Sequence, residues 1–271
     1  MNRGVMLKAV YESWPATLMC GLLLAGVEAI VAYVIPTFQA QFSESLMQIE
    51  FIQTFVSAML GIDAAEQLGP EAFAAFPWVH PVVLAVVWTH ALVSCTRVPA
   101  GEVDRGTIDL TLTLPVTRWG ILASETIVWI GTGVVVLLAG LAGNEIGSQF
   151  VVEEFRVPLE RKLIILANLF CLYLAVGGLA WLVSASSNRR GPAIIIVFVV
   201  LLASFLLNFL SQFWSVAERI SFLGILDYYR PVYVLRDGSV PWYDMSILLA
   251  VGVVLWIIAG AIFARRDVCT V

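Results

Sequence analysis

The chain is poor in charged residues. Aspartate, glutamate, lysine and arginine together make up 13% of its 271 residues, whereas hydrophobic residues make up 60%. Soluble domains carry about 25% charged residues, so an ordinary water-soluble surface is excluded. The net charge of -5 also argues against a basic patch for nucleic acid, and no nucleic-acid partner is expected. The composition indicates an integral membrane protein in contact with the lipid bilayer.

Cysteine, histidine and lysine are all scarce. The four cysteines form no Cys-x-x-Cys pair and none falls in an outer loop, so neither disulfides nor a structural metal site are expected. The two histidines, His80 and His90, belong to no Ser-His-Asp or metalloprotease pattern. The lysines, Lys8 and Lys162, follow no glycine-rich phosphate-binding loop. ATP hydrolysis is therefore not expected on this chain.

Long apolar runs dominate the chain instead. Each is close to the ~20 residues that a helix needs to cross a ~30 Å hydrocarbon core. The runs are continuously apolar, unlike the ~10-residue alternating segments of a membrane β-barrel. We therefore predict an all-α polytopic membrane protein that forms a single domain over residues 1–271. The six predicted spans cover about 15–38, 79–97, 119–143, 163–186, 192–214 and 245–264.

Lysine and arginine are distributed unevenly between the two sides of these spans. Nine fall on the side of the termini and six on the other, so the positive-inside rule places both termini in the cytoplasm. Residues 39–78, on the opposite side, contain five acidic residues and neither lysine nor arginine. We expect a multi-pass protein of the cell (inner) membrane.

Three shorter segments flank the spans. Residues 1–13 carry an apolar face with Lys8 and Glu12 at i,i+4 spacing, which suggests a short helix along the inner membrane surface or a frayed lead-in to the first span. Residues 45–60 start with a capping-box pattern and continue with helical apolar spacing, so we predict an outer amphipathic helix. The aromatic-rich segment 216–244 suits the outer membrane interface.

The polar segment 102–118 separates the second and third spans. Its apolar and polar residues alternate as in a strand, but an apolar stripe also recurs at helical spacing. An isolated strand would leave backbone groups unpaired, so we favour a short helix that follows a turn at 104–106 and ends before Pro115. The helical stripe consists of Val103, Thr107, Leu110 and Leu114.

The order of residues in this segment is distinctive. An acidic residue, an Arg-Gly-Thr turn, a second acidic residue, leucines and Pro-Val-Thr-Arg follow one another just before the third span. This order resembles the cytoplasmic coupling loop of type-2 ABC exporter permeases. The sequence Phe-Ala-Arg-Arg-Asp at 263–267 resembles the closing motif of the same family, and a weaker likeness covers 60–80. Glu125 departs from the pattern, because family members often carry lysine there. The matching loop positions are Glu102, Arg105, Gly106, Thr107, Asp109, Leu112, Pro115, Val116, Thr117 and Arg118.

The resemblance implies a permease driven by ATP that a separate cytoplasmic ABC ATPase hydrolyses. ATP and magnesium would bind to that partner, in two copies, while this chain would bind no cofactor and would not be an enzyme. A second copy of this chain, or a related permease, would complete a shared path. The loop would dock its apolar stripe in a groove of the ATPase, with the charges of Glu102, Asp104, Arg105 and Asp109 setting the register. The expected coupling residues are Glu102, Arg105, Gly106, Thr107, Asp109, Leu110, Leu114, Pro115 and Arg118.

Three ionisable residues, Glu28, His90 and Glu125, lie within predicted spans. A charge at mid-span is costly, about 2.5–3.5 kcal/mol for aspartate on insertion scales. By helical rise, Glu28 lies about 20 Å from the inner end and the other two about 10 Å. We hypothesise a hydrogen-bonded pair between His90 and Glu125. The alternatives are a neutral packing role for His90 and a protonated Glu28 bonded to a neighbouring span. His80, before Pro81, is expected to start a helix.

The favoured function is the permease subunit of an ATP-driven exporter for an unidentified substrate. A proton-driven secondary transporter acting through Glu28 is the alternative, although no inverted repeat supports it. An intramembrane enzyme with Glu28, His90 or Glu125 as acid and base is less favoured, because a reactive nucleophile beside a base is missing.

Overall fold

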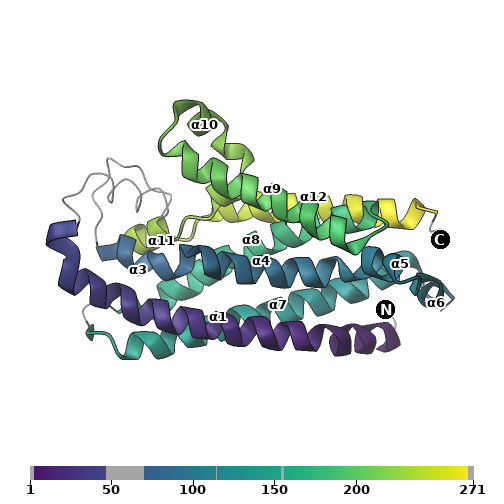
Figure 1. Ribbon diagram of the computed structural model, residues 1–271, viewed down its shortest axis with the longest axis horizontal. Helices are drawn as coiled ribbons and strands as arrows, with labels where there is room; N and C mark the ends of the chain where they lie inside the picture. The colour runs from purple at the N-terminus through teal and green to yellow at the C-terminus, as the bar shows by residue number, and fades with distance from the viewer. Residues whose placement is uncertain (1–2, 47–69, 114, 154–155, 268–271) are drawn as a thin grey trace.

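The computed structural model describes residues 3–46, 70–113, 115–153 and 156–267. Every element within these ranges is helical. Six segments are long and apolar enough to cross a membrane, which confirms the predicted all-α polytopic architecture. Figure 1 shows the long helices running side by side in an elongated bundle, with both chain ends and the short helices α5 and α6 at the same end.

Single helices form five of the spans, and a pair of helices forms the sixth. The spans are α1 (Arg3–Leu46), the pair α3 (Pro70–Val79) and α4 (Pro81–Cys95), α7 (Arg118–Gln149), α8 (Leu159–Ser186), α9 (Arg190–Ser211) and α12 (Trp242–Arg265). The second and third spans are joined by η1 (Arg97–Gly101), α5 (Glu102–Asp104) and α6 (Ile108–Leu112). The last two are joined by α10 (Ser215–Ile220), η3 (Ser221–Leu223), η4 (Ile225–Tyr228) and α11 (Pro231–Asp237).

The first span differs from the prediction. Instead of a surface helix followed by a span over 15–38, α1 is one continuous helix of 44 residues. Ala9 and Ser13, which belong to the predicted apolar face, are buried, and Val5 packs against Val98 and Ile121. The bundle therefore covers part of this face, while Val10 of the same face is 46% exposed.

The second span begins earlier than predicted, at Phe73, and is interrupted at His80. The backbone N–H of Val82 donates to His80 Nδ1 at 3.3 Å, and Pro81 occupies the first position of α4, where its missing N–H has no helical partner to lose. The prediction that His80 starts a helix is confirmed. The predicted outer helix at 45–60 falls almost wholly on residues 47–69, outside the described ranges.

Glycines bring α1 and α7 into backbone contact. A Cβ added at Gly143 would lie 2.1 Å from the carbonyl oxygen of Ala25, and one at Gly147 would lie 2.2 Å from that of Ala29. Small residues permit such close packing in membranes, where apolar side chains gain little by leaving lipid for a neighbouring helix. A similar contact joins α8 and α12 at Gly178 and Gly252. These two pairs form the framework of the bundle.

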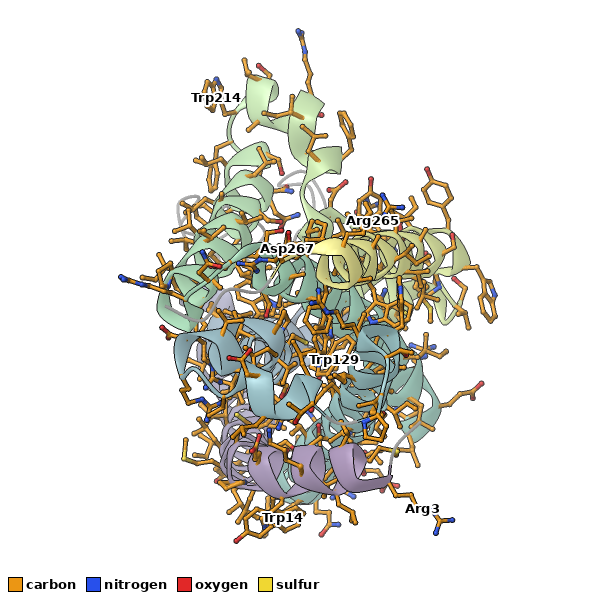
Figure 2. All side chains as sticks on the ribbon, turned by 90° about the vertical axis from the view of Figure 1, so that its right-hand side faces the viewer. Arg3, Trp14, Trp129, Trp214, Arg265 and Asp267 are labelled. Atoms are coloured by element: carbon orange, nitrogen blue, oxygen red, sulfur yellow. The ribbon has the colours of Figure 1, made fainter. Side chains whose placement is uncertain are left out.

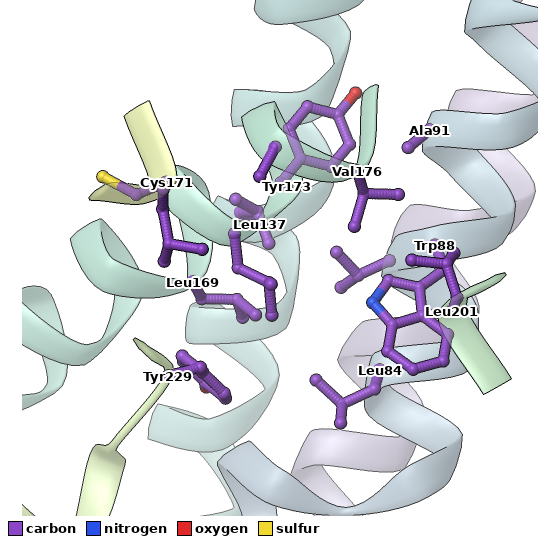
Figure 3. Packing of buried hydrophobic residues seen from close by; sticks show 14 of the residues in the cluster. Leu84, Trp88, Ala91, Leu137, Leu169, Cys171, Tyr173, Val176, Leu201 and Tyr229 are labelled. Carbon is purple, nitrogen blue, oxygen red and sulfur yellow. The ribbon is translucent and has the colours of Figure 1, made fainter. Parts of the chain in front are cut away.

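The core lies around α8. Tyr173, Trp181 and Leu172 are at most 1% exposed, and Figure 3 shows Tyr173 and Val176 facing Ala91 and Trp88 of α4. The centre of the bundle is thus filled by side chains. By contrast, only 22% of the most apolar stretch of α9 is buried. Viewed from the end that carries the 102–118 segment, α9 lies on the far side of the bundle from α1 (Figure 2).

Replacing Gly143 with alanine should destabilise the protein by about 1–3 kcal/mol, because the added methyl group meets the backbone of α1. Gly131→Ala is the matched control on the same helix, since a Cβ there meets nothing within 4 Å. Thermal unfolding of the purified proteins in detergent measures both effects. Equal midpoints for the two variants would show that α1 and α7 do not pack as described.

Candidate functional site

The 102–118 segment folds as two short helices, α5 and α6, joined by a turn at Gly106. This glycine has a φ of +68°, in the left-handed region that residues with a Cβ rarely adopt. Its N–H donates to the carbonyl of Val103 at 3.0 Å, and the N–H of Thr107 donates to that of Glu102 at 2.9 Å. The described part of the segment therefore forms backbone hydrogen bonds within itself, and α6 ends before Pro115. The predicted helix is confirmed and the strand alternative is wrong.

Glu102 points into the protein. Its side chain is 2% exposed and accepts hydrogen bonds from Lys8 Nζ at 2.9 Å, Thr107 Oγ1 at 2.9 Å and Thr111 Oγ1 at 3.3 Å. Burial alone would raise the pKa of Glu102, but these bonds and the charge of Lys8 outweigh burial and hold the pKa below its ordinary value. The expectation that Glu102 sets the register of a partner by surface charge is therefore wrong, because its carboxylate is buried and pairs with Lys8 of α1.

Arg97 lies at the start of the same loop and binds two carboxylates. Its guanidinium donates to Glu12 of α1 and to Glu125 of α7. Arg97 and Glu125 are 9% and 4% exposed, respectively. Lys8 also approaches Glu12, with 3.9 Å between Nζ and Oε1. These contacts join with that of Glu102 into one series of ion pairs, which we call the staple and which consists of Glu102, Lys8, Glu12, Arg97 and Glu125.

The hypothesised pair between His90 and Glu125 is not what the structure shows. Glu125 binds Arg97, while His90 lies 3.0 Å from the hydroxyl of Tyr173 through Nδ1 and 3.3 Å from that of Thr17 through Nε2. Thr17 Oγ1 also donates to Ser13 O, and the Tyr173 hydroxyl also donates to Trp129 O, so a neutral imidazole can donate its single N–H to only one of these two hydroxyl oxygens. His90 thus connects α1, α4 and α8 as a buried hydrogen-bonding residue.

Arg118 binds the end of the last span. Its Nη1 donates to the carbonyl of Phe263 at 2.9 Å and to that of Arg266, and its guanidinium lies 5.8 Å from the Phe263 ring centre. Arg266 in turn donates to the carbonyls of Ala185 and Ser187 at 2.7 and 3.0 Å. The two sequence motifs therefore meet in space, and Arg118 is directed to the C-terminal motif.

The tip of the loop exposes a small surface. Leu110 is 71% exposed, and Asp104, Arg105 and Asp109 are exposed beside it. We call these four residues the tip surface. Ile108 and Thr111 on the other side of α6 are buried, so the helix is amphipathic with its back against the bundle. Pro115 is exposed, and Leu114 lies outside the described residues.

Glu28 lies in the half of the bundle farther from the loop. Its side chain is 1% exposed, and Asn144 Nδ2 of α7 donates to its Oε2 at 2.9 Å. It is therefore hydrogen-bonded to a neighbouring span, as one of the sequence alternatives proposed. No group of three or more metal-binding side chains occurs within the described part of the chain.

Several residues of the site were missed from sequence. Lys8 and Glu12 were predicted only as a local pair, and no partner was predicted for Arg97. A signal was available, because all three are charged residues placed near the ends of spans, where an unpaired charge close to hydrocarbon is costly. Tyr173 and Asn144 carried no such signal, since either residue suits an ordinary span interface.

A filled bundle of six apolar spans, with a short loop paired to α1 and α7 at the end that carries both termini, defines an all-α polytopic membrane protein. A family model described as ABC-2 family transporter protein matches residues 14–268. The chain belongs to this family. It is accordingly a membrane permease of an ABC transporter, and membership implies association with an ABC ATPase subunit. A comparison with curated proteins gives no significant match.

Replacing Arg97 with leucine should lower the free energy of unfolding by about 3–5 kcal/mol, because Glu125 would be left buried without its partner. Replacing both residues with leucine should recover most of that loss, since a buried apolar pair carries no uncompensated charge. Thermal unfolding in detergent compares the two variants with the wild type. Glu12→Gln is the control, because Glu12 is 30% exposed and water can replace its partner. A double variant as unstable as Arg97→Leu would contradict the pairing.

Proposed function

We propose that this chain is the membrane subunit of an ATP-driven exporter whose tip surface docks on the cytoplasmic ABC ATPase. The observation that supports this role is the two-sided construction of α6. Leu110 is exposed next to the exposed Asp109, whereas Ile108 is fully buried at 0% exposure. An apolar residue with a charged rim suits a groove on a protein partner. ATP and magnesium belong to that partner.

The orientation follows from the chain's positive charges. The end of the bundle that carries the tip surface and both termini is the one with more lysine and arginine, so we place it in the cytoplasm. A cytoplasmic ATPase then has direct access to α5 and α6. The inner membrane of the cell is the location that this orientation suits.

The staple supplies the mechanical connection. Force applied at the tip surface reaches α1 through Glu102 and Lys8, and reaches α7 through Arg97 and Glu125. Closure of the ATPases would therefore move α1, α7 and the loop as one body and would tilt the bundle from inward-facing to outward-facing. Rigid-body motion of packed elements is an established type of switching transition.

The filled core favours two permease subunits. Tyr173, Trp181 and Leu172 occupy the centre of the bundle and are at most 1% exposed, so a substrate path through one subunit would require the core to unpack. A path shared between two copies, or between this chain and a related permease, avoids that cost. Each copy would bind one ATPase, and outward export is the direction we propose.

Replacing Leu110 with aspartate should reduce co-purification of the ATPase at least about tenfold, since about 1.4 kcal/mol of binding free energy corresponds to that factor. Leu223→Asp is the matched control, because Leu223 is 69% exposed, close to the 71% of Leu110, but lies in η3 beyond the other end of the spans. Pull-down from detergent extracts through a tag on the permease measures the bound ATPase. Undiminished recovery with Leu110→Asp would exclude the tip surface as the docking site.

A further inference from the structure

Glu28 is a buried carboxyl group that the staple and the tip surface do not use. It lies in α1 beside the glycines through which α7 packs closely on α1. A Cβ added at Gly140 would lie 3.8 Å from the Cγ of Glu28. Asn144 donates to Glu28 Oε2 from the next turn of α7. An asparagine or glutamine at position 28 would offer the same interhelical hydrogen bond without an ionisable group, so helix packing alone does not account for a glutamate.

The charged and titratable neighbours of Glu28 come from two other elements. Lys162 of α8 is the cation whose field reaches it, but the Lys162 amine donates to Glu145 at 2.7 Å and to Ser148 at 3.1 Å. The pKa of Tyr229, which follows η4, lies above its ordinary value. Burial is the larger cause, and the nearby Glu28 carboxylate adds to the rise. The Tyr229 hydroxyl donates to Trp78 O of α3 at 3.1 Å. From α7 the neighbour is the neutral Asn144. Among the described residues, no cation is in direct contact with the carboxyl group.

A pocket lies beside this carboxyl group. It holds about 30 Å³ of space for water, and it is lined by the polar residues Asn144, Ser148 and Lys162 and by apolar residues that include Ala32 and Ala74. Asn144 thus lines the pocket and bonds Glu28 at the same time. A pocket with several polar groups in its lining is suited to water, which can carry a proton to or from a carboxyl group bonded to one of them.

We propose that Glu28 is a proton-binding site, protonated in the conformation described here and connected to the side opposite the loop by the pocket at Asn144. This low-dielectric interface favours the neutral carboxylic acid. An ionised Glu28 would have one amide donor and no paired cation to offset the cost of burying its charge. Parting α1 from α7 at this level hydrates the carboxyl group and releases its proton. Acid on the pocket side therefore stabilises the closed interface.

This site is independent of ATPase docking. The tip surface and Glu28 lie in opposite halves of the bundle, and the proton site requires only the α1 and α7 interface and the adjoining pocket. A negative result for Glu28 leaves the docking test unaffected, and loss of docking leaves the carboxyl group in place.

Infrared spectroscopy of the purified full-length chain in lipid nanodiscs tests the proposal. At neutral pH the wild type should show the carbonyl band of one protonated carboxylic acid, and Glu28→Gln should lose it. Glu160→Gln is the matched control, since Glu160 is exposed to water at the start of α8. A Glu28→Gln spectrum identical to that of the wild type in this region would overturn the proposal.

Two further variants keep the test decisive if Glu28→Gln does not fold. Asn144→Ala retains Glu28 but removes its donor, so the acid band should shift or disappear, and an unchanged band would contradict the site. Ala74→Trp should fill the pocket and slow deuterium exchange of the acid at least several-fold, while leaving Asn144 and Lys162 in place. Equal exchange rates in Ala74→Trp and the wild type would overturn the proposed connection through the pocket.

Discussion

The structure depends on the pairing of buried charges at the end of the bundle that carries the loop. Arg97 and Glu125 are both less than 10% exposed, and Glu102 is 2% exposed, so none of them can rely on water for solvation. Such groups remain charged only when a partner compensates them. The partners come from three parts of the chain. Lys8 and Glu12 belong to α1, Glu125 belongs to α7, and Arg97 and Glu102 belong to the loop. Pairing the charges therefore fixes the loop to two spans.

The glycine contacts extend this connection across the bilayer. Gly140, Gly143 and Gly147 hold α7 against α1 from the middle of the bundle to the end that faces away from the loop. The staple joins the same two helices at the other end. The staple and the glycine contacts therefore join α1, α7 and the loop at both ends of the bundle. Glu28 lies within the glycine contact, far from the staple.

Sequence predicted the parts of this unit that depend on local chemistry. Apolar runs of membrane length admit few structures, so the six spans were predictable, and the turn at Gly106 followed from backbone requirements. The direction of a side chain around a helix was not predictable. His90 and Glu125 were correctly placed within the second and third spans, but His90 faces Tyr173 and Glu125 faces Arg97. Glu102 turns inward because of Lys8, which lies 94 residues away in the chain.

The claim that α1 and the loop move as one body can be measured directly. Spin labels at Tyr11→Cys and Thr113→Cys, with Cys269 replaced by serine, occupy exposed positions on α1 and just after α6. Double electron–electron resonance on the complete transporter would give the distance between the two labels with and without ATP. The account predicts an unchanged separation within one subunit, while labels at Tyr11 alone report a changed distance between the two copies. A shift between Tyr11 and Thr113 on addition of ATP would contradict it.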